Sequence, residues 1–247
     1  MNQIVLMYHC VYANDRKETG FQSSGANVYK LSAIEFEKQV KAIRETYPID
    51  CPVVFTFDDG GVSFYSVIAP ILEKYHFKGY FFISTDYIGT NGFLSAEQIL
   101  NLHTRGHVIG SHSCSHPSRM IDLDDETLLK EWVESCKTLS GIIGEDIKVA
   151  SIPNGYSNKS IIQAMLNAGI LQIYTSEPTD KIRNIEKHIQ IIGRYAILSS
   201  MSTQNVLSIV NNKNVRRKLL VRSLGLEIVK KILGKSYVII REKLLKH

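Results

Sequence analysis

The 247-residue sequence lacks the features that mark several large classes of protein. No apolar run approaches the roughly 18 residues that a membrane-spanning helix needs. The segment Met1–Tyr8 has no basic region, and its apolar stretch is too short for a secretion signal. Cysteine is scarce, with four residues and no C-x-x-C pair. We therefore expect a cytoplasmic protein whose thiols are free.

Basic and acidic residues are unevenly distributed along the chain. The net charge is +5, but residues 204–247 hold 11 Lys and Arg against 2 Asp and Glu, and residues 1–203 hold 18 against 22. Apolar residues make up 44% and charged residues 21%, which is ordinary for a globular protein and argues against global disorder. A basic block on an acidic body indicates contact with an anionic partner.

Short apolar runs alternate with helical patterns along most of the chain. Ser32 and Ser95 each begin a capping box, and Asn158 is a third candidate helix start. Alternating strands and helices predict βαβ units, and the length suits one α/β domain built on a parallel sheet or barrel. The polar segment Val11–Tyr29 is placed like a loop on the catalytic rim of such a barrel. The expected strands are Ile4–Tyr8, Val53–Phe57, Lys78–Ile83, Val108–Gly110, Val149–Ile152 and Leu171–Thr175.

The strongest local signal is the run Thr56–Gly60, with the sequence TFDDG. Asp58 and Asp59 follow an apolar strand, where two carboxylates are costly unless a metal or a proton transfer uses them. At a strand-to-loop turn, both side chains can reach one pocket. Asp-Asp-Gly is also common turn chemistry, so a solvated turn is the alternative.

The second signal is the run His112–Pro117, with the sequence HSCSHP. Two histidines four residues apart can ligate one metal, although a pair of surface histidines is equally compatible with this spacing. Together with Asp59, His112 and His116 complete a set of two histidines and one carboxylate. Such a set leaves metal positions open for water and substrate, as a catalytic site requires.

These residues resemble the motifs of the polysaccharide deacetylase family, carbohydrate esterase family 4. Thr56–Gly60 matches the first motif, and His112–Pro117 matches the H-[ST]-x-x-H-P motif. Leu6–His9 looks like the opening strand of one subgroup, and Gly106–Ser111 like the usual segment before the histidines. Ser151–Gly155 lies where a third motif, often R-x-P-[YF]-G, is expected.

The resemblance covers roughly residues 4–197 and implies a distorted (β/α) barrel with its site at the carboxyl ends of the strands. It implies that Asp59, His112 and His116 bind one divalent ion, usually zinc, and that Asp58 is the general base. A bound metal would acidify water and polarise an acetamide carbonyl. The backbone N–H of Asn154, after the motif proline, would then stabilise the oxyanion.

The sequence departs from the family pattern in the groups that move protons. Ser151 stands where the base-orienting Arg is expected, and Arg194 is a candidate substitute, although a surface or ion-paired Arg is the alternative. The late L-x-H motif that supplies the general acid is not evident. His188 is the nearest candidate in sequence, and it could equally belong to a solvated turn. The candidate substrate-binding residues are Pro153, Asn154 and Tyr156.

The C-terminal segment is predicted to be helical, basic and amphipathic. We expect a catalytic barrel over residues 1–203 and a tail over residues 204–247, broken by Gly225 and Gly234 into two or three helices. The tail could pack on the barrel or lie on an anionic membrane surface, which would place the protein at the inner face of the membrane. It has few aromatics and no nucleic-acid motif, so we expect no nucleic-acid partner.

The leading functional hypothesis is a metal-dependent hydrolase of linear amide bonds that deacetylates an N-acetylated amino sugar. A cytoplasmic enzyme has no access to finished wall polymer, so we expect a lipid- or nucleotide-linked precursor, or an oligosaccharide, in surface-polysaccharide assembly. One alternative is a deformylase or another amidohydrolase with the same site. A second is an inactive, metal-retaining sugar-binding protein, which an intact Asp58 argues against, because metal binding alone does not need it.

Overall fold

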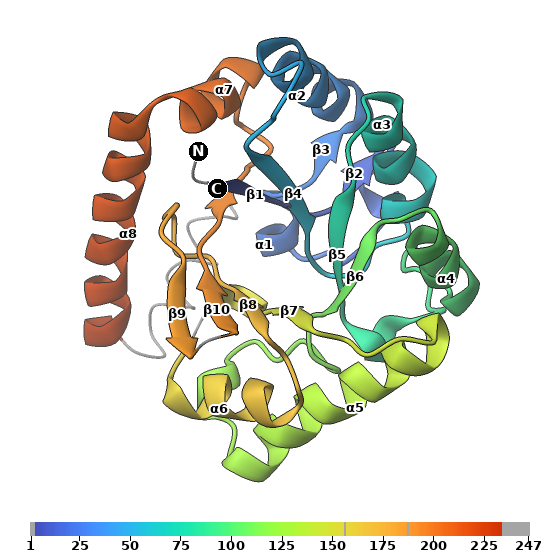
Figure 1. Ribbon diagram of the computed structural model, residues 1–247, viewed down its shortest axis with the longest axis vertical. Coiled ribbons are helices and arrows are strands. Elements are labelled where there is room, and N and C mark those ends of the chain that lie inside the picture. The colour runs from blue at the N-terminus through green and yellow to red at the C-terminus, as the bar shows by residue number, and fades with distance from the viewer. Residues whose placement is uncertain (1–2, 156, 187, 234–247) are drawn as a thin grey trace.

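A nine-stranded sheet forms the centre of the computed structural model, which describes residues 3–155, 157–186 and 188–233 (Figure 1). The strand order is β11-β1-β4-β5-β6-β7-β8-β10-β9. All neighbouring pairs are parallel except β10 with β9, which are antiparallel. The bounds are β1 Ile4–Tyr8, β4 Val53–Phe57, β5 Gly79–Ile83, β6 Val108–Ser111, β7 Val149–Ser151, β8 Gln172–Tyr174, β9 Arg183–Glu186, β10 Ile189–Ile192 and β11 Tyr195–Ala196.

The sheet curls into an incomplete barrel with helices around its outside (Figure 1). Among the described residues, β9 and β11 are the two edges of the sheet and do not pair with each other. The α/β barrel expected from the sequence is confirmed, in a form that stays open on one side. The helices are α1 Ser24–Asn27, α2 Ala33–Thr46, α3 Ala69–Lys74, α4 Ala96–Thr104, α5 Asp125–Ile143, α6 Lys159–Asn167, α7 Thr203–Asn211 and α8 Lys213–Leu233.

The helix starts follow the capping residues in the sequence. The side chains of Ser32, Ser95 and Asn158 each accept a hydrogen bond from a backbone N–H in the first turn, at the starts of α2, α4 and α6. The reciprocal capping box forms at Ser95, where the Gln98 side chain accepts from the Ser95 N–H. These caps fix where α2, α4 and α6 begin.

Each strand presents one face to the helices and the other to the inside of the barrel. The larger core lies between sheet and helices and includes Phe57 and Phe81. The barrel interior holds a small apolar group in which Phe82 packs with residues of four other strands. The period of two along β5 sends Phe82 inward and its neighbours outward. The members of this inner group are Val5, Phe82, Val149, Tyr174 and Ile192.

Several short elements occupy the expected rim loop. Val11–Tyr29 contains β2 (Val11–Tyr12), the 3-10 turn η1 (Arg16–Glu18) and α1, and β2 pairs with β3 (Leu31–Ser32). The other short turns are η2 (Phe64–Ile68, a π-helix), η3 (Thr85–Tyr87), η4 (Met120–Asp122) and η5 (Pro153–Gly155). The loop is therefore more ordered than its lack of periodicity predicts, because tertiary contacts rather than local pattern hold it.

The C-terminal helices begin inside the fold. In α7, Val206, Ile209 and Val210 join the main core. The helix α8 then runs without interruption through Gly225, so the predicted break there is wrong, and Gly234 lies outside the described residues. A single glycine costs a helix only about 1 kcal/mol, which its neighbours can offset. Within the described ranges, no helix combines the length and the apolar character needed to cross a membrane.

Candidate active site

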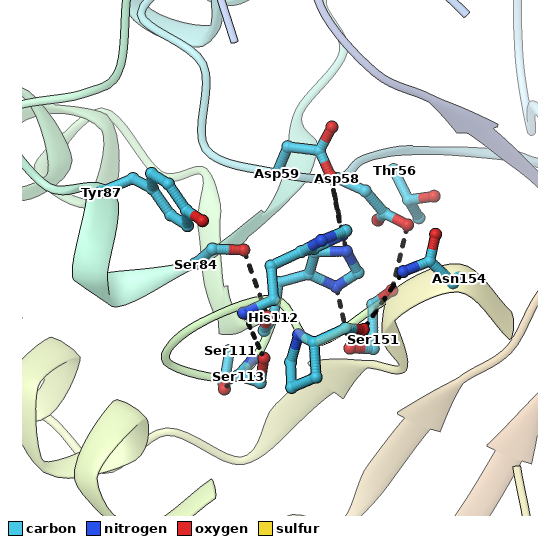
Figure 2. Close-up of polar contacts among 12 residues, drawn as sticks. Thr56, Asp58, Asp59, Ser84, Tyr87, Ser111, His112, Ser113, Ser151 and Asn154 are labelled. Carbon is cyan, nitrogen blue, oxygen red and sulfur yellow. Dashed lines mark hydrogen bonds and ion pairs between the residues drawn. The ribbon is translucent and has the colours of Figure 1, made fainter. Parts of the chain in front are cut away.

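The carboxyl ends of β4, β6 and β7 bring the chemically active side chains together (Figure 2). Asp58 and Asp59 follow β4, His112 follows β6, and Ser151 ends β7. These strands are parallel, so their carboxyl ends meet at one rim of the barrel, as in other α/β barrels. Asp58, Asp59, His112 and Ser151 are all buried there.

Asp59, His112 and His116 form a group that could hold a metal ion. Their candidate ligand atoms all lie within 4.8 Å of one another. The Asp59 Oδ1 atom is 3.6 Å from Nε2 of His112 and 3.4 Å from Nε2 of His116. Two imidazoles and one carboxylate suit zinc and several other divalent ions, and they leave coordination positions open.

The surroundings orient each histidine for ligation. The Nδ1 atom of His112 is 2.9 Å from the Ser151 carbonyl oxygen, so Nδ1–H donates and Nε2 keeps a lone pair facing Asp59. Burial lowers the pKa of His112 to about 3 and also lowers the pKa of His116, so both imidazoles are neutral. The His116 ring lies against the ring of Phe21, with centroids 4.9 Å apart.

The backbone around these ligands adopts a conformation that ordinary side chains disfavour. Asp59 has φ 90°, Ser113 φ 63° and His116 φ 53°. Non-glycine residues in this region cost about 1–3 kcal/mol each and persist where the surrounding structure imposes them. Gly60 follows Asp59 with φ 92°, and a Cβ there would lie 3.0 Å from Cγ2 of Ile83. The turn at residues 58–61 therefore directs the Asp59 carboxylate toward the two histidines, with a strained backbone at Asp59.

Glu131 of α5 anchors the loop between the two histidines. Its Oε2 atom accepts the backbone N–H groups of Cys114 and Ser115 at 2.9 and 3.0 Å, and its Oε1 atom accepts the Ser115 hydroxyl at 2.7 Å. Nothing local in the sequence marks Glu131, because it lies 17 residues beyond Cys114. The contact depends on how α5 packs beside β6.

Asp58 forms an ion pair with Arg194 and is not one of the candidate metal ligands. The Nη1 and Nη2 groups of Arg194 donate to Asp58 Oδ1 and Oδ2 at 2.6 and 2.7 Å. The Ser151 hydroxyl donates to Asp58 Oδ2 at 3.1 Å and accepts from Nη2 of Arg194 at 2.7 Å. The remaining guanidinium protons go to Thr56 Oγ1 and the Thr175 carbonyl, so all five N–H donors are used.

The two adjacent carboxylates have opposite electrostatic environments. Burial alone would raise the pKa of Asp58, but the Arg194 guanidinium outweighs it and holds this pKa well below its usual range. Burial raises the pKa of Asp59 to about 6, against the opposing influence of His9. Asp58 is thus an anion at neutral pH, and a cation bound beside Asp59 would keep that group ionised as well.

His9 lies at the carboxyl end of β1, on the same rim. Its ring stacks on Tyr29 with centroids 4.4 Å apart. Its Nδ1 atom is buried and finds no hydrogen-bond partner in the part of the chain that the structure describes. A buried polar atom without a partner is unusual in a folded protein.

The remaining sequence-predicted residues separate into three groups. Pro153 and Asn154 lie in η5 on this rim, and the Asn154 side-chain amide donates to the Pro117 carbonyl at 3.3 Å. Tyr156 lies outside the described residues. His188 is exposed in the turn that precedes β10, at the amino ends of the parallel strands. It therefore lies at the opposite end of the barrel from Asp58, and its prediction as the proton donor is wrong.

Comparisons with known proteins show which family the chain is similar to. The family model described as "Polysaccharide deacetylase" matches residues 48–173, just over half of the chain. A curated relative, named as the polysaccharide deacetylase YxkH of Bacillus subtilis, is 24% identical over 180 residues. That match covers 70% of this chain and 64% of the relative, so the chain spans just under two thirds of that protein's length.

Solved structures share the fold. The Streptococcus pyogenes deacetylase PplD in complex with acetate matches with a TM-score of 0.72 and 20% identity, over 85% of this chain and 99% of that one. BC0361, a polysaccharide deacetylase from Bacillus cereus, matches with a TM-score of 0.71 and 18% identity, over 85% and 69%. The family match and these folds confirm the resemblance drawn from the motifs.

Proposed function

The chain belongs to the polysaccharide deacetylase family, and on that premise we propose that it is a metal-dependent hydrolase that removes the N-acetyl group of an amino sugar. The substrate would be a lipid- or nucleotide-linked precursor, or an oligosaccharide, in surface-polysaccharide assembly. The structure of the deacetylase PplD supports this proposal, since it holds acetate, the acid that N-deacetylation releases.

The observation that carries the proposal is the environment of Asp58. This carboxylate is buried beside the candidate metal group, yet Arg194 and Ser151 hold it, and it is not one of the three grouped ligand residues. A protein that only binds a metal or a sugar has no need of a buried anion in this place. A hydrolase needs such an anion to accept the proton of the attacking water.

Each residue of the site has a separate role in the proposed reaction. A divalent ion held by Asp59, His112 and His116, with zinc as the family's usual metal, would supply an acidified water and a polarised acetamide carbonyl. Asp58 accepts the water's proton, and Arg194 keeps its carboxylate aimed while the proton moves. The Asn154 backbone N–H donates to the oxyanion that develops on the substrate carbonyl.

His9 is the proton donor that this proposal assigns to the leaving amine. We prefer it to His188 in that role because His9 follows β1 on the rim that carries Asp58, whereas His188 precedes β10 at the opposite end of the barrel. A protonated imidazole there would donate to the sugar nitrogen as the amide bond breaks. Acetate and a free amine would then leave the site.

The test uses acetate release from N-acetylhexosamine conjugates together with metal analysis of the purified protein. The Asp58→Asn variant should keep its metal and lose activity by about 100-fold or more, because a general base contributes roughly 10²–10⁴-fold. The matched control is Asp50→Asn, which changes an exposed carboxylate in the turn before β4 and should keep full activity. An Asp58→Asn enzyme with more than a tenth of wild-type activity, or wild-type protein without stoichiometric metal, would refute the proposal.

The same assay separates the alternatives. Formate release in place of acetate would favour the deformylase hypothesis, and release of another acid would favour a different amidohydrolase. An inactive sugar-binding protein would hold metal and bind an N-acetylated sugar without releasing either acid.

We further propose that α8 lies on an anionic membrane surface. Arg216 fixes the start of this helix to α7, because its Nη1 group donates to the carbonyls of Ile209 and Val210 at 2.9 Å. Farther along, Val221 is 63% exposed and Leu224 is 49% exposed, beside several exposed cations. Exposed apolar residues among basic ones are typical of helices that lie in an anionic interface. The neighbouring exposed cations are Arg217, Lys218 and Arg222.

A further inference from the structure

The loop after β8 forms a turn that holds Arg194 in place. The Arg194 backbone N–H donates to the Glu177 carbonyl at 2.9 Å, and its Nε–H donates to the Thr175 carbonyl at 3.1 Å. The Glu177 carbonyl also accepts the N–H of Thr179 at 2.8 Å. Pro178 lies between these two residues, and its ring fixes one backbone torsion. The turn is therefore tight, and its shape sets where Arg194 lies.

Gly193, the residue before Arg194, packs against the same turn. A Cβ at Gly193 would lie 2.5 Å from the Glu177 carbonyl oxygen and 2.5 Å from Cγ2 of Thr179. Such distances are shorter than real contacts, so glycine is needed for the two segments to approach this closely. A shift of the turn would therefore pass directly to the backbone of Arg194.

An ion pair joins this turn to the C-terminal helices. Asp180 directly follows Thr179, and its Oδ2 atom is 3.4 Å from Nε of Arg216 in the first turn of α8. The Nη1 group of Arg216 donates to the carbonyls of Ile209 and Val210 in the last turn of α7. The guanidinium of Arg216 thus connects α7 and α8 to the loop after β8.

The Asp180–Arg216 ion pair is mostly buried and lies close to β11. The Arg216 side chain is 9% exposed and the Asp180 side chain 24%, so water and salt screen their attraction less than that of a surface pair. Burial raises the pKa of Tyr195 to about 12, and the Asp180 charge adds to this rise while the Arg216 charge opposes it. Both charges therefore act at the residue that directly follows Arg194.

We propose that Asp180 and Arg216 are positioning residues for Arg194. Through the loop after β8, their ion pair keeps the Arg194 guanidinium where it meets both carboxylate oxygens of Asp58. The helix α8 thereby supports turnover through bonds to this loop rather than through a residue in the site. The inference rests on the proposed hydrolase function. If the pair only attached α8 to the barrel, its loss would lower stability without changing turnover by the folded protein.

The kinetic experiment measures acetate release from N-acetylhexosamine conjugates by the full-length, metal-loaded protein. Asp180→Asn nearly keeps the size of the side chain and removes its charge, and Arg216→Met removes the guanidinium. Asp180→Glu is the conservative variant, because it keeps the carboxylate. The control is Lys181→Met, which removes an exposed charge next to Asp180.

Asp180→Asn and Arg216→Met should each lower kcat by about tenfold, because a displacement of about 1 Å in a catalytic group can cost up to 10²-fold. KM should change by less than about twofold, since the ion pair acts on the base and not on substrate binding. Asp180→Glu should keep at least about half of the wild-type kcat, and Lys181→Met should keep all of it. In an Arg194→Lys background, Asp180→Asn should cost less than about twofold, because the effects of residues that act through one another are not additive.

A second measurement follows Arg194 itself and needs neither metal nor turnover. In protein made with isotope-labelled arginine, the NMR resonance of the Arg194 Nε–H group is assigned by its absence from Arg194→Lys. This group is buried and bonded to the Thr175 carbonyl, so its hydrogen exchange should be slow. Asp180→Asn should speed the exchange by about tenfold or more, whereas Lys181→Met should leave it unchanged.

The proposal is overturned if kcat stays within about twofold of the wild type in both Asp180→Asn and Arg216→Met, or if exchange at Arg194 is unchanged in both. An equal loss in Lys181→Met would also overturn it, since a general charge effect would then be sufficient. If Arg216→Met does not fold, Asp180→Asn decides alone, because its side chain is partly exposed and nearly keeps its size. If the wild type releases no acid, the proposed function fails, and exchange at Arg194 still decides the positioning role.

Discussion

Replacing Arg194 with methionine should destabilise the fold more than any surface charge substitution. Arg194 is 1% exposed, and its two short bonds to Asp58 are the main compensation for burying that carboxylate. Breaking a buried ion pair from one side costs about 3–5 kcal/mol, because the remaining charge is left without a partner. The total stability of a domain is only about 5–15 kcal/mol, so we expect the loss to be visible in every unfolding measurement.

The loss of stability in the Arg194→Met variant should increase with pH, because of the ionisation of Asp58. In the wild type the pKa of Asp58 lies below its ordinary value of 3.8, so its contribution is complete above that pH and is lost only as the pH falls further. Without Arg194, burial sets the pKa above 3.8, so ionisation then opposes folding as the pH rises. Urea unfolding at pH 4.5 and pH 7.5, with a chelator present, should show the larger deficit at the higher pH.

Two control variants test whether the unpaired charge of Asp58 causes the loss of stability. The double variant Asp58→Asn/Arg194→Met should recover about 2 kcal/mol or more, because no buried charge is then left unpaired. Arg183→Met breaks an exposed ion pair with Glu177, whose atoms are 3.3 Å apart, and it should cost less than about 1 kcal/mol. A deficit below about 1 kcal/mol for Arg194→Met, or an equal deficit at both pH values, would refute the reasoning.

Three further predictions concern other parts of the molecule. Glu131→Gln should weaken metal affinity by about tenfold in a chelator competition, since it anchors the ligand loop, and unchanged affinity would contradict this. Arg105 holds the pKa of Glu73 at about 2, so the contribution of Glu73 to stability is complete above about pH 4.5 and is lost as the pH falls toward 2. In the Glu73→Gln variant, the urea midpoint should therefore decline less steeply as the pH falls below 4.5. An unaltered decline would show that Glu73 does not contribute to it. Val221→Asp should reduce sedimentation with phosphatidylglycerol vesicles severalfold, whereas Ile34→Asp, at a residue that is even more exposed, should not. Absence of binding by the wild type would refute the membrane proposal.

Much of the fold was predictable because its signals are local. The expected strands Ile4–Tyr8 and Val53–Phe57 match β1 and β4 residue for residue, and the other predicted strands differ by one residue at one or both ends. Gly225 failed as a predicted break because the cost of one glycine is small beside the contacts of a 21-residue helix. The open side of the barrel was not predictable, since strand pairing at the sheet edges depends on long-range packing.

The candidate site was predictable to the extent that its residues lie in contiguous motifs. The three grouped ligand residues come from two short runs, and the structure places them together. Arg194 could be named only as a candidate, because it reaches Asp58 across 136 residues of sequence. His188 and His9 show the limit most clearly: nearness in sequence favoured the first, and the parallel sheet places only the second on the rim.

The late position of Arg194 also has a consequence for how the site matures. A chain that emerges from the ribosome amino end first has displayed Asp59, His112 and His116 once residue 116 is out, but it lacks the guanidinium until almost 80 residues later. The three candidate ligand residues are thus synthesised before Arg194, which holds the Asp58 carboxylate. A nascent chain that extends past residue 116 but not to residue 194 contains the candidate ligand residues without the arginine that pairs with Asp58, so competence for turnover waits for Arg194.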